Sequence, residues 1–352
     1  MPEKPVGVGI VGAGANTRSR HIPGLRAIPG VEIVGVVNRT SESSARVAQE
    51  FGIPKTYANW RAVIEDPQVD AVCIGTWPDM HCEITCAALA AGKHVLTEAR
   101  MARNAAEAHR MQAAALAQPG VVAQIVPSPF GLVQEPFIHS LLKHSYIGQL
   151  REVVVLGADS MFWDYTEPLH WRQDVQISGV NLLALGILHE TVSRWIPPTI
   201  RVFAQTNCFE RQRPLAGEPG LVDVTVPDSA QIVTLIEGGA RGIYHMSGIT
   251  LFGPGKQIHL YGSRGTIKYV MTPQEQLFCG RPGDSELEPV NIPEDQRGGW
   301  RVEAEFIAAV RGQDKVHYTD FATGVRYMEF TEAVARSAAL NLPVDLPLKS
   351  LA

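Results

Sequence analysis

The chain has 352 residues, of which 45% are hydrophobic and 19% charged, and its formal net charge at pH 7 is −5. This length is too great for one ordinary core and suits a globular protein of two domains. The basic residues are scattered and form no Lys/Arg run, which argues against nucleic acid as a partner.

The first third of the chain alternates strand-like and helix-like patterns. The strand-like runs are predicted at residues 6–11, 31–37, 71–75, 94–97 and 121–126. The helical patterns between them cover residues 21–28, 41–51, 82–91 and 105–118, and Ser41 is the expected cap of the second helix. Because the runs are apolar throughout, we expect strands that are covered on both faces in a doubly wound parallel sheet.

After residues 127–130 the pattern changes to strands in succession. They are predicted at residues 150–157, 200–206, 230–236, 240–247, 257–261 and 266–270, with helices at 135–143, 180–195, 302–311 and 321–340. Turns rich in glycine at residues 237–239 and 262–265 indicate antiparallel pairing. The sequence therefore predicts an α/β domain over residues 1–125 and an α+β domain with an open, mostly antiparallel sheet over residues 126–352.

Location is inferred from the N-terminus, the uncharged segments and the cysteines. The N-terminus passes directly into the first strand without a signal-peptide pattern. The longest uncharged stretch, residues 111–134, is interrupted by prolines and glutamines, so no membrane span is expected. The five cysteines lack CxxC spacing, and Cys82 and Cys86 have no His/Asp partner at ligand spacing, so no metal is predicted. We expect a cytoplasmic protein.

A glycine turn follows the first predicted strand. Gly12 permits a tight turn, and Gly14 lets the backbone approach a pyrophosphate at the start of a helix. Thr17 replaces the third glycine of the dinucleotide fingerprint, and the alternative is a tight turn without a ligand. The cofactor-binding residues expected in this loop are Gly12, Ala13, Gly14, Asn16, Thr17 and Arg18.

The end of the second strand bears on the choice of cofactor. An Asp or Glu usually binds the free ribose 2′-hydroxyl of NAD(H) at this point, whereas this chain has Asn38. Arg39, Thr40 and Ser41 suit a 2′-phosphate through charge-assisted hydrogen bonds. The sequence therefore favours NADP(H), with NAD(H) as the second choice, while a solvated loop arginine is the alternative interpretation of Arg39.

Five stretches carry a resemblance over nearly the whole chain. They are GIVGAG, VDAVCIGTWPDMHCEITCAALAAGKHVLTEARMARNAAEA, IGQLREVVV, HWRQD and DFATGVRYMEFTEAVARSA. With them the chain resembles the glucose–fructose oxidoreductase/inositol dehydrogenase/rhizopine-catabolism (Gfo/Idh/MocA) family. The resemblance implies a Rossmann domain, a nicotinamide cofactor, a sugar-like substrate, and pairing into a homodimer or homotetramer through the sheet of the second domain.

The chain departs from the family at two site elements. Members typically carry Glu-Lys-Pro, where the lysine assists proton transfer, whereas here Glu98 is followed by Ala99 and Arg100. A guanidinium stays protonated and cannot act as a base, so Arg100 is either an anion clamp or a surface arginine. In the family's Asp-x-Gly-x-His element the aspartate position is Ala184 and the histidine position is Leu188.

The remaining candidates follow from the resemblance and from side-chain chemistry. Against the nicotinamide ribose it places the stretch with Thr76, Trp77 and His81, and Trp77 would stack on the cofactor. Glu98 is also expected among the cofactor-binding residues. The alternative for His81 and Glu98 is a helix cap and a strand-end hydrogen bond. The expected substrate-binding residues are Arg100, Trp171, Arg172 and Asp174, and the expected catalytic residues are His189 and His170. His189 lies about 100° around a helix from Leu188, and a buried structural histidine is its alternative.

Three functions are compatible with these residues. The first is an NAD(P)-dependent oxidoreductase that acts by hydride transfer on a sugar, a cyclic polyol or a related hydroxy or keto compound. The second is a nicotinamide-dependent enzyme that cleaves glycosides. The third is a non-catalytic protein that senses a dinucleotide or a sugar, which the replacement of the usual Lys, Asp and His positions would also fit.

Overall fold

The computed structural model describes residues 5–349 and divides the chain into two compact units. Unit 1 is the chain up to Pro127 together with Arg301–Val325, and unit 2 is Ser128–Trp300 with the chain from Arg326 onward. The sequence prediction assigned all of residues 126–352 to the second domain, whereas the structure returns residues 301–325 to the first. One reason is long-range pairing, because the Ile125 N–H donates to the Thr319 carbonyl at 3.0 Å.

Unit 1 contains the predicted doubly wound parallel sheet. Its six strands are β1 (Val6–Val11), β2 (Val31–Val37), β3 (Lys55–Thr56), β4 (Ala71–Ile74), β5 (His94–Thr97) and β6 (Ala123–Ile125). They lie in the order β3-β2-β1-β4-β5-β6 and all pair in parallel. Every residue of β1 is buried, as expected for an apolar strand that is covered on both faces.

Short helices connect these strands. They are the π-helix η1 (Thr17–His21) and the α-helices α1 (Ile22–Arg26), α2 (Ser41–Phe51), α3 (Trp60–Glu65), α4 (Pro78–Ala90) and α5 (Ala105–Leu116). The later helix α9 (Val302–Val310) belongs to the same unit. The expected cap of α2 was one residue late: the hydroxyl of Thr40, which has an extended backbone, accepts the Ser43 N–H at 3.2 Å. Gly52 ends this helix in the left-handed conformation.

Unit 2 contains the predicted open sheet, which is mixed but mostly antiparallel. Its nine strands are β7 (Leu150–Ala158), β8 (Thr199–Asn207), β11 (Ser229–Ile236), β12 (Arg241–Ser247), β13 (Gly255–Gly262), β14 (Thr266–Val270), β15 (Gln276–Gly280), β16 (Glu288–Pro289) and β17 (Val344–Asp345). The order is β16-β15-β14-β13-β7-β12-β11-β8-β17, and only β7 and β12 pair in parallel. A separate hairpin joins β9 (Gln212–Pro214) and β10 (Leu221–Asp223).

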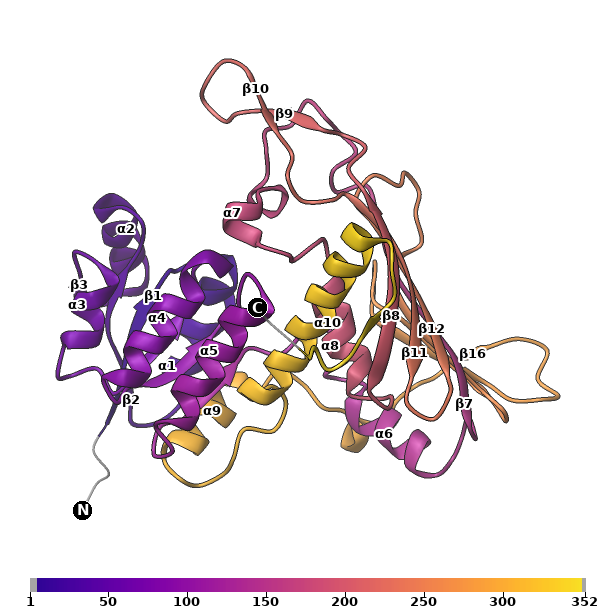
Figure 1. Cartoon of the computed structure of the whole chain (residues 1–352). Coiled ribbons are helices and arrows are strands. Elements are labelled where there is room, and N and C mark those ends of the chain that lie inside the picture. Colours follow the sequence, from indigo (N-terminus) through magenta and orange to yellow (C-terminus); the bar gives the residue numbers. More distant parts are fainter. Residues whose placement is uncertain (1–4, 350–352) are drawn as a thin grey trace. The chain divides into compact units, whose positions relative to one another are not determined.

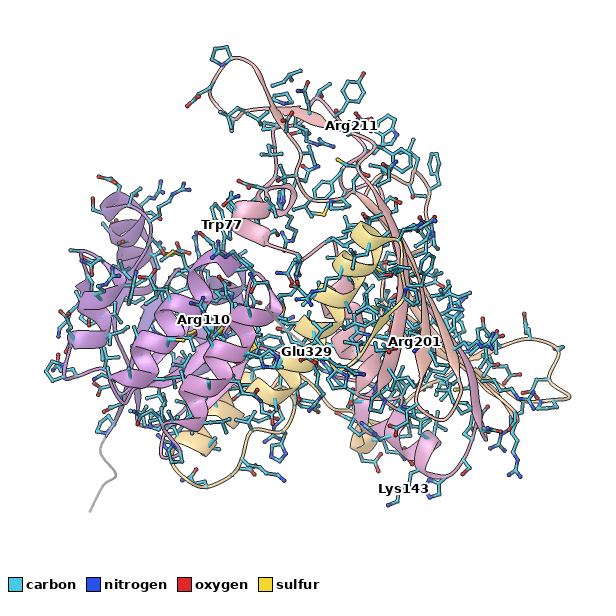
Figure 2. The ribbon with its side chains drawn as sticks, in the orientation of Figure 1. Trp77, Arg110, Lys143, Arg201, Arg211 and Glu329 are labelled. Atoms are coloured by element: carbon cyan, nitrogen blue, oxygen red, sulfur yellow. The ribbon has the colours of Figure 1, made fainter. Side chains whose placement is uncertain are left out.

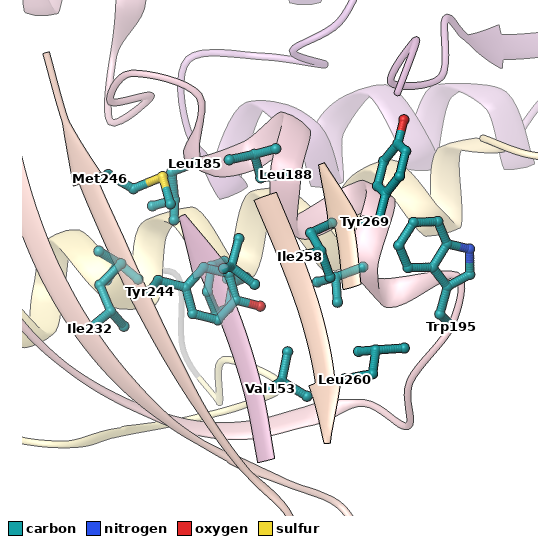
Figure 3. Close-up of a cluster of buried hydrophobic side chains, with 14 of the residues drawn as sticks. Val153, Leu185, Leu188, Trp195, Ile232, Tyr244, Met246, Ile258, Leu260 and Tyr269 are labelled. Carbon is teal, nitrogen blue, oxygen red and sulfur yellow. The ribbon is translucent and has the colours of Figure 1, made fainter. Parts of the chain in front are cut away.

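Helices cover one face of this sheet. The helical segments of unit 2 are α6 (Glu135–Lys143), η2 (Trp171–Gln173), α7 (Val175–Ser178), α8 (Leu185–Ser193), η3 (Glu294–Gln296) and most of α10 (Phe321–Leu340). Figure 1 shows α8 and α10 against the same face of the strands. Alternate residues of the strands, such as Tyr244, Met246 and Ile258, point into the layer that they share with Leu188 (Figure 3). The period-2 pattern of β11 and β12 leaves Val233 and Ile243 exposed.

Across residues 5–349, the structure contains no helix of the length and apolarity that crossing a bilayer requires.

One buried hydroxyl holds the loop that enters unit 2. The Tyr269 hydroxyl accepts the Gly131 N–H at 2.7 Å, and Tyr269 is fully buried beside Trp195. Tyr269→Phe leaves that N–H unpaired and should lower the free energy of unfolding by about 1–3 kcal/mol. Tyr261→Phe, at a more exposed hydroxyl on β13, is the matched control. Urea unfolding followed by tryptophan fluorescence tests this, and equal effects in both variants would contradict it.

Candidate functional site

The first strand of unit 1 ends in a turn that only glycine can make. Gly12 has φ +84°, and its N–H donates to the Val37 carbonyl at 2.8 Å. A Cβ atom at Gly12 would lie 2.7 Å from the backbone nitrogen of Thr76. Residue 12 must therefore be glycine, because the turn requires a positive φ and leaves no room for a side chain. Glycine at this position lets the ends of β1 and β4 approach each other closely.

Thr17 is buried beneath this loop. Its hydroxyl donates to the Gly12 carbonyl at 3.2 Å, and a Cβ atom at Gly75 would lie 2.1 Å from that hydroxyl oxygen. The space that the third glycine of the fingerprint usually provides is therefore supplied by Gly75 on the neighbouring strand end. Thr17 was expected to bind the cofactor, whereas the structure gives it a bracing contact inside the loop.

Asn38 braces the same loop from the end of β2. Its Oδ1 accepts the Ala13 N–H at 2.7 Å, and its Nδ2 donates to the Ser43 hydroxyl at 3.0 Å. Its backbone N–H donates to the Ser44 hydroxyl at 2.8 Å. An amide can accept and donate in this way, whereas a carboxylate at the same position could not donate to Ser43.

A cavity of about 770 Å³ opens at this end of the sheet. Its lining includes Gly12, Ala13, Gly14, Asn38, Arg39, Thr40, Ser43, Arg46, Asn59, Trp60, Thr76, Trp77 and Asp79. The Arg39 guanidinium lies 5.7 Å from the centre of the Trp77 ring, and Trp77, labelled in Figure 2, is 40% exposed. A cavity at the carboxyl ends of β1, β2 and β4, entered by a glycine turn, fits a dinucleotide.

Five of the residues expected at the cofactor lie outside the cavity lining, namely Asn16, Thr17, Arg18, His81 and Glu98. Arg18 is exposed and pairs with Glu50 on α2. His81 is buried, with Nδ1 at 2.9 Å from the Arg100 carbonyl and Nε2 at 3.0 Å from the Thr76 carbonyl. Burial lowers the pKa of His81 despite these backbone contacts. His81 thus connects the ends of β4 and β5, and Arg100 is itself buried.

Glu98 belongs to a charged cluster inside unit 1. Its Oε1 lies 2.9 Å from His21 Nε2 and also accepts from Asn16 Nδ2, while His21 Nδ1 lies 2.5 Å from Glu303 Oε1. Burial disfavours a charged His21 ring, but the hydrogen bonds to Glu303 and Glu98 outweigh it and raise its pKa to about 9. Burial opposes ionisation of Glu98 as well, but the hydrogen bond and charge of His21 hold the pKa of Glu98 below its usual value.

The polar–aromatic cluster of unit 2 lies around η2. The Arg172 guanidinium stands 4.1 Å from the centre of the Trp171 ring, and His170 stacks on Trp171 at 5.6 Å between ring centres. His170 Nδ1 accepts the Arg172 N–H at 3.2 Å, which leaves Nε2 as the protonated nitrogen of a neutral ring. Asp174 accepts the Gln176 N–H at 2.8 Å and caps α7, so its carboxylate has a structural role.

His189 lies in the core of unit 2. Its ring stacks on Phe330 at 3.5 Å between centres with an angle of 5°, and Nδ1 is 2.9 Å from the Tyr244 hydroxyl. Burial lowers the pKa of His189 to about 3, so the ring is neutral at physiological pH. This environment is that of a packed histidine and gives little support to a catalytic role. Leu188 and Ala184 lie on the same helix or at its start, without any titratable group.

Two family models match the chain, one for each unit. The first, described as an oxidoreductase family with an NAD-binding Rossmann fold, matches residues 6–125. The second, described as the GFO/IDH/MocA C-terminal domain, matches residues 137–268. The fold thus defines an oxidoreductase class with a Rossmann domain. The chain belongs to the Gfo/Idh/MocA family.

Individual relatives share only part of their sequence with this chain. The 1,5-anhydro-D-fructose reductase of Ensifer adhaerens is 39% identical over 107 residues, covering 30% of this chain and 32% of that protein. The levoglucosan dehydrogenase of Pseudarthrobacter phenanthrenivorans is 26% identical over 235 residues, covering 61% and 58%. The chain thus matches about a third of the first relative and under three fifths of the second. A solved structure of levoglucosan dehydrogenase with NADH and L-sorbose has a TM-score of 0.87 at 22% identity, over 97% of this chain and 99% of that one.

Some residues of the site were not selected from the sequence. They are Ser43, Arg46, Asn59 and Trp60 of the cavity lining, and His21 and Glu303 of the charged cluster. Ser43 and Arg46 had a signal, since they lie within two turns of Thr40 at the start of a predicted helix. His21 and Glu303 are separated by 282 positions, and no local pattern links them.

Gly14 offers a test of the cavity as a binding site. A Cβ atom at Gly14 would have the Gly75 carbonyl oxygen as its nearest neighbour, at 3.6 Å, an ordinary contact. Gly14→Ala should therefore keep the fold but place a methyl group in the cavity and weaken coenzyme binding by roughly 10-fold or more, about 1.4 kcal/mol. Calorimetric titration with NADPH and NADH measures this. Gly120→Ala, with no atom within 4 Å, is the control, and unchanged binding in Gly14→Ala would refute the site.

Proposed function

We propose that this chain is an NADP(H)-dependent oxidoreductase that transfers hydride to or from a sugar, a cyclic polyol or a related hydroxy compound. The observation that carries the proposal is the cavity at the Gly12 turn, whose lining suits a phosphorylated dinucleotide. A bound nicotinamide coenzyme supplies the hydride acceptor or donor, and the protein must orient the substrate and handle a proton.

The preference for NADP(H) rests on the charges at the end of β2. Arg39 and Arg46 line the cavity together with the hydroxyl groups of Thr40 and Ser43. Asn38, which is committed to Ala13 and Ser43, presents no carboxylate to a ribose. Guanidinium groups bind phosphate through strong charge-assisted hydrogen bonds, so a 2′-phosphate would be favoured here.

A sugar-like substrate is supported by the η2 cluster of unit 2. The stacked Trp171 and Arg172 combine an apolar face with several hydrogen-bond donors, a pairing that suits a ring bearing hydroxyl groups. Burial lowers the pKa of Arg172, although the guanidinium stays charged at neutral pH. The names of the relatives, a levoglucosan dehydrogenase and a 1,5-anhydro-D-fructose reductase, point to the same substrate class.

Proton transfer needs a group other than Ala99. Of the two histidines expected from the sequence, we favour His170, because it is only partly buried and its Nε2 makes no hydrogen bond within the described part of the chain.

We also propose that a second copy of the chain covers the sheet face that exposes Val233 and Ile243.

The coenzyme preference has a direct test. Arg39→Gln removes a cation from the cavity and should weaken NADPH binding by about 10- to 100-fold, the effect of a lost charge-assisted hydrogen bond, with NADH binding nearly unchanged. Arg110→Gln, at an arginine on α5 outside the cavity lining (labelled in Figure 2), is the matched control. Fluorescence titration of both coenzymes measures the ratio, and equal losses for NADPH and NADH would count against a 2′-phosphate contact.

Substitution of His170 should affect turnover, whereas substitution of His189 should affect stability. His170→Gln should lower kcat by about 100-fold, within the range of general acid–base catalysis, while coenzyme binding is retained. His189→Gln breaks a buried contact and should instead lower the thermal midpoint with kcat of the folded protein nearly unchanged. NADPH consumption with a panel of aldoses, ketoses and polyols is the assay. A large loss of kcat in His189→Gln alone would reverse the assignment.

A further inference from the structure

Glu98 is one member of a chain of four side chains brought together from distant parts of unit 1. Asn16 comes from the glycine loop, His21 from η1, Glu98 from the end of β5 and Glu303 from α9. His21 is the centre, with its two ring nitrogens 2.9 Å and 2.5 Å from carboxylate oxygens of Glu98 and Glu303. Its side chain is fully buried.

The geometry favours a protonated ring, although the Asn16 Nδ2 atom also lies 3.3 Å from His21 Nε2. Both ring nitrogens face a carboxylate, and only the imidazolium form donates hydrogen bonds from both. In a neutral ring, the lone pair of one nitrogen would face a buried carboxylate anion. This repulsion without a hydrogen bond would cost folding free energy. Gly24 provides the room for this arrangement, because a Cβ atom there would lie 2.8 Å from the Glu303 carboxylate.

Glu98 is held by one oxygen only. Asn16 and His21 both donate to its Oε1, whereas Oε2 makes no hydrogen bond to any residue in the range 5–349. The Glu98 side chain is 16% exposed, against 4% for Glu303. One oxygen is therefore anchored, and the other remains available to accept a hydrogen bond.

The free carboxylate oxygen of Glu98 belongs to a residue that lies next to the cavity. Its N–H donates to the Ile74 carbonyl at 2.9 Å, so Glu98 stands beside Gly75 and Thr76, which line the cavity on the β4 side. The residues suited to the adenosine end of a dinucleotide lie at β2, on the other side of β1. In this fold the second nucleoside lies across the switch point, toward β4 and β5.

We propose that His21 is a positioning residue that holds Glu98 as a fixed anionic acceptor for a hydroxyl or amide donor in the nicotinamide half of the coenzyme, with Glu303 as the second counter-charge. This inference rests on the proposed function. Because Glu98 is held in its ionised form, it orients a donor and does not serve as the missing base in place of Ala99.

The charges around His21 set a pH dependence. Glu98 and Glu303 face the ring. Burial, and then the charges of these two carboxylates, raise the pKa of Cys73 on β4. His81, whose own pKa burial lowers, acts on Glu98 only through its charge. With a folded pKa of about 9 against 6.5 for the free side chain, the stability due to His21 is complete below the lower value. It is lost as the pH rises through 9. Coenzyme affinity should fall in the same interval.

The experiment is coenzyme titration by calorimetry from about pH 7.5 to about pH 10.5, an interval that brackets the His21 transition. Wild type should lose affinity by roughly 10-fold across it, the value of about one hydrogen bond. His21→Gln should bind about 10-fold more weakly at the lower pH and show no such transition. His317→Gln, at an exposed histidine paired with Asp314 in the same unit, is the matched control and should follow wild type.

Glu303→Gln is the second variant, useful if His21→Gln does not fold. It removes one of the two anions that face His21, so the pKa of His21 and the midpoint of the affinity loss should both move to lower pH. Ring resonances of His21 in wild type, followed by NMR, give the protonation state without coenzyme. Affinity that stays constant while His21 titrates, or a neutral His21 at about pH 7.5, would overturn the inference. If wild type binds no coenzyme at any pH while His21 is protonated, the proposed function fails, and the inference fails with it.

Discussion

The site of unit 1 depends on the close approach of two backbone segments, the turn at Gly12 and the end of β4 at Gly75. Side chains at either position would collide with the other segment or with Thr17. With this contact in place, Thr17 and Asn38 form hydrogen bonds to the loop, and Gly14 lines the cavity. The shape of the cavity therefore results from backbone packing at these glycines. The polar side chains around it supply the charges and hydrogen-bonding groups.

Charged side chains gather in two regions of unit 1, at the ends of β2 and β5. At the end of β2 the cavity is lined by the cations Arg39 and Arg46, which suit a phosphate. At the end of β5 the charges of Glu98 and Glu303 are bridged by His21 within unit 1. The family's lysine is absent from the second region, where Ala99 follows Glu98, and Glu98 pairs with His21 of the same unit. A buried cluster of this kind is stable only while its charges remain paired.

Three histidines show how far environment decides chemistry. His21 lies between two carboxylates, and its pKa is raised. His189 packs on Phe330 in an apolar core, and its pKa is lowered. His170, partly exposed beside Trp171, also has a lowered pKa, first through burial and then through the charge of Arg172. The same side chain is thus a cation, a core residue and a candidate proton donor.

The sequence by itself determined most of the strands, the parallel sheet of unit 1, the open sheet of unit 2 and the glycine turn, but it did not indicate strands such as β3, β15 and β17. These features are encoded locally, by apolar runs, by alternation and by glycine where φ must be positive. Only the tertiary structure decided that residues 301–325 belong to unit 1, that Thr17 is buried and that His189 lies in the core. It also brought His21 to Glu98 and Glu303. Burial and pairing between positions far apart in the chain leave no periodic signal, because they depend on which surfaces meet after folding.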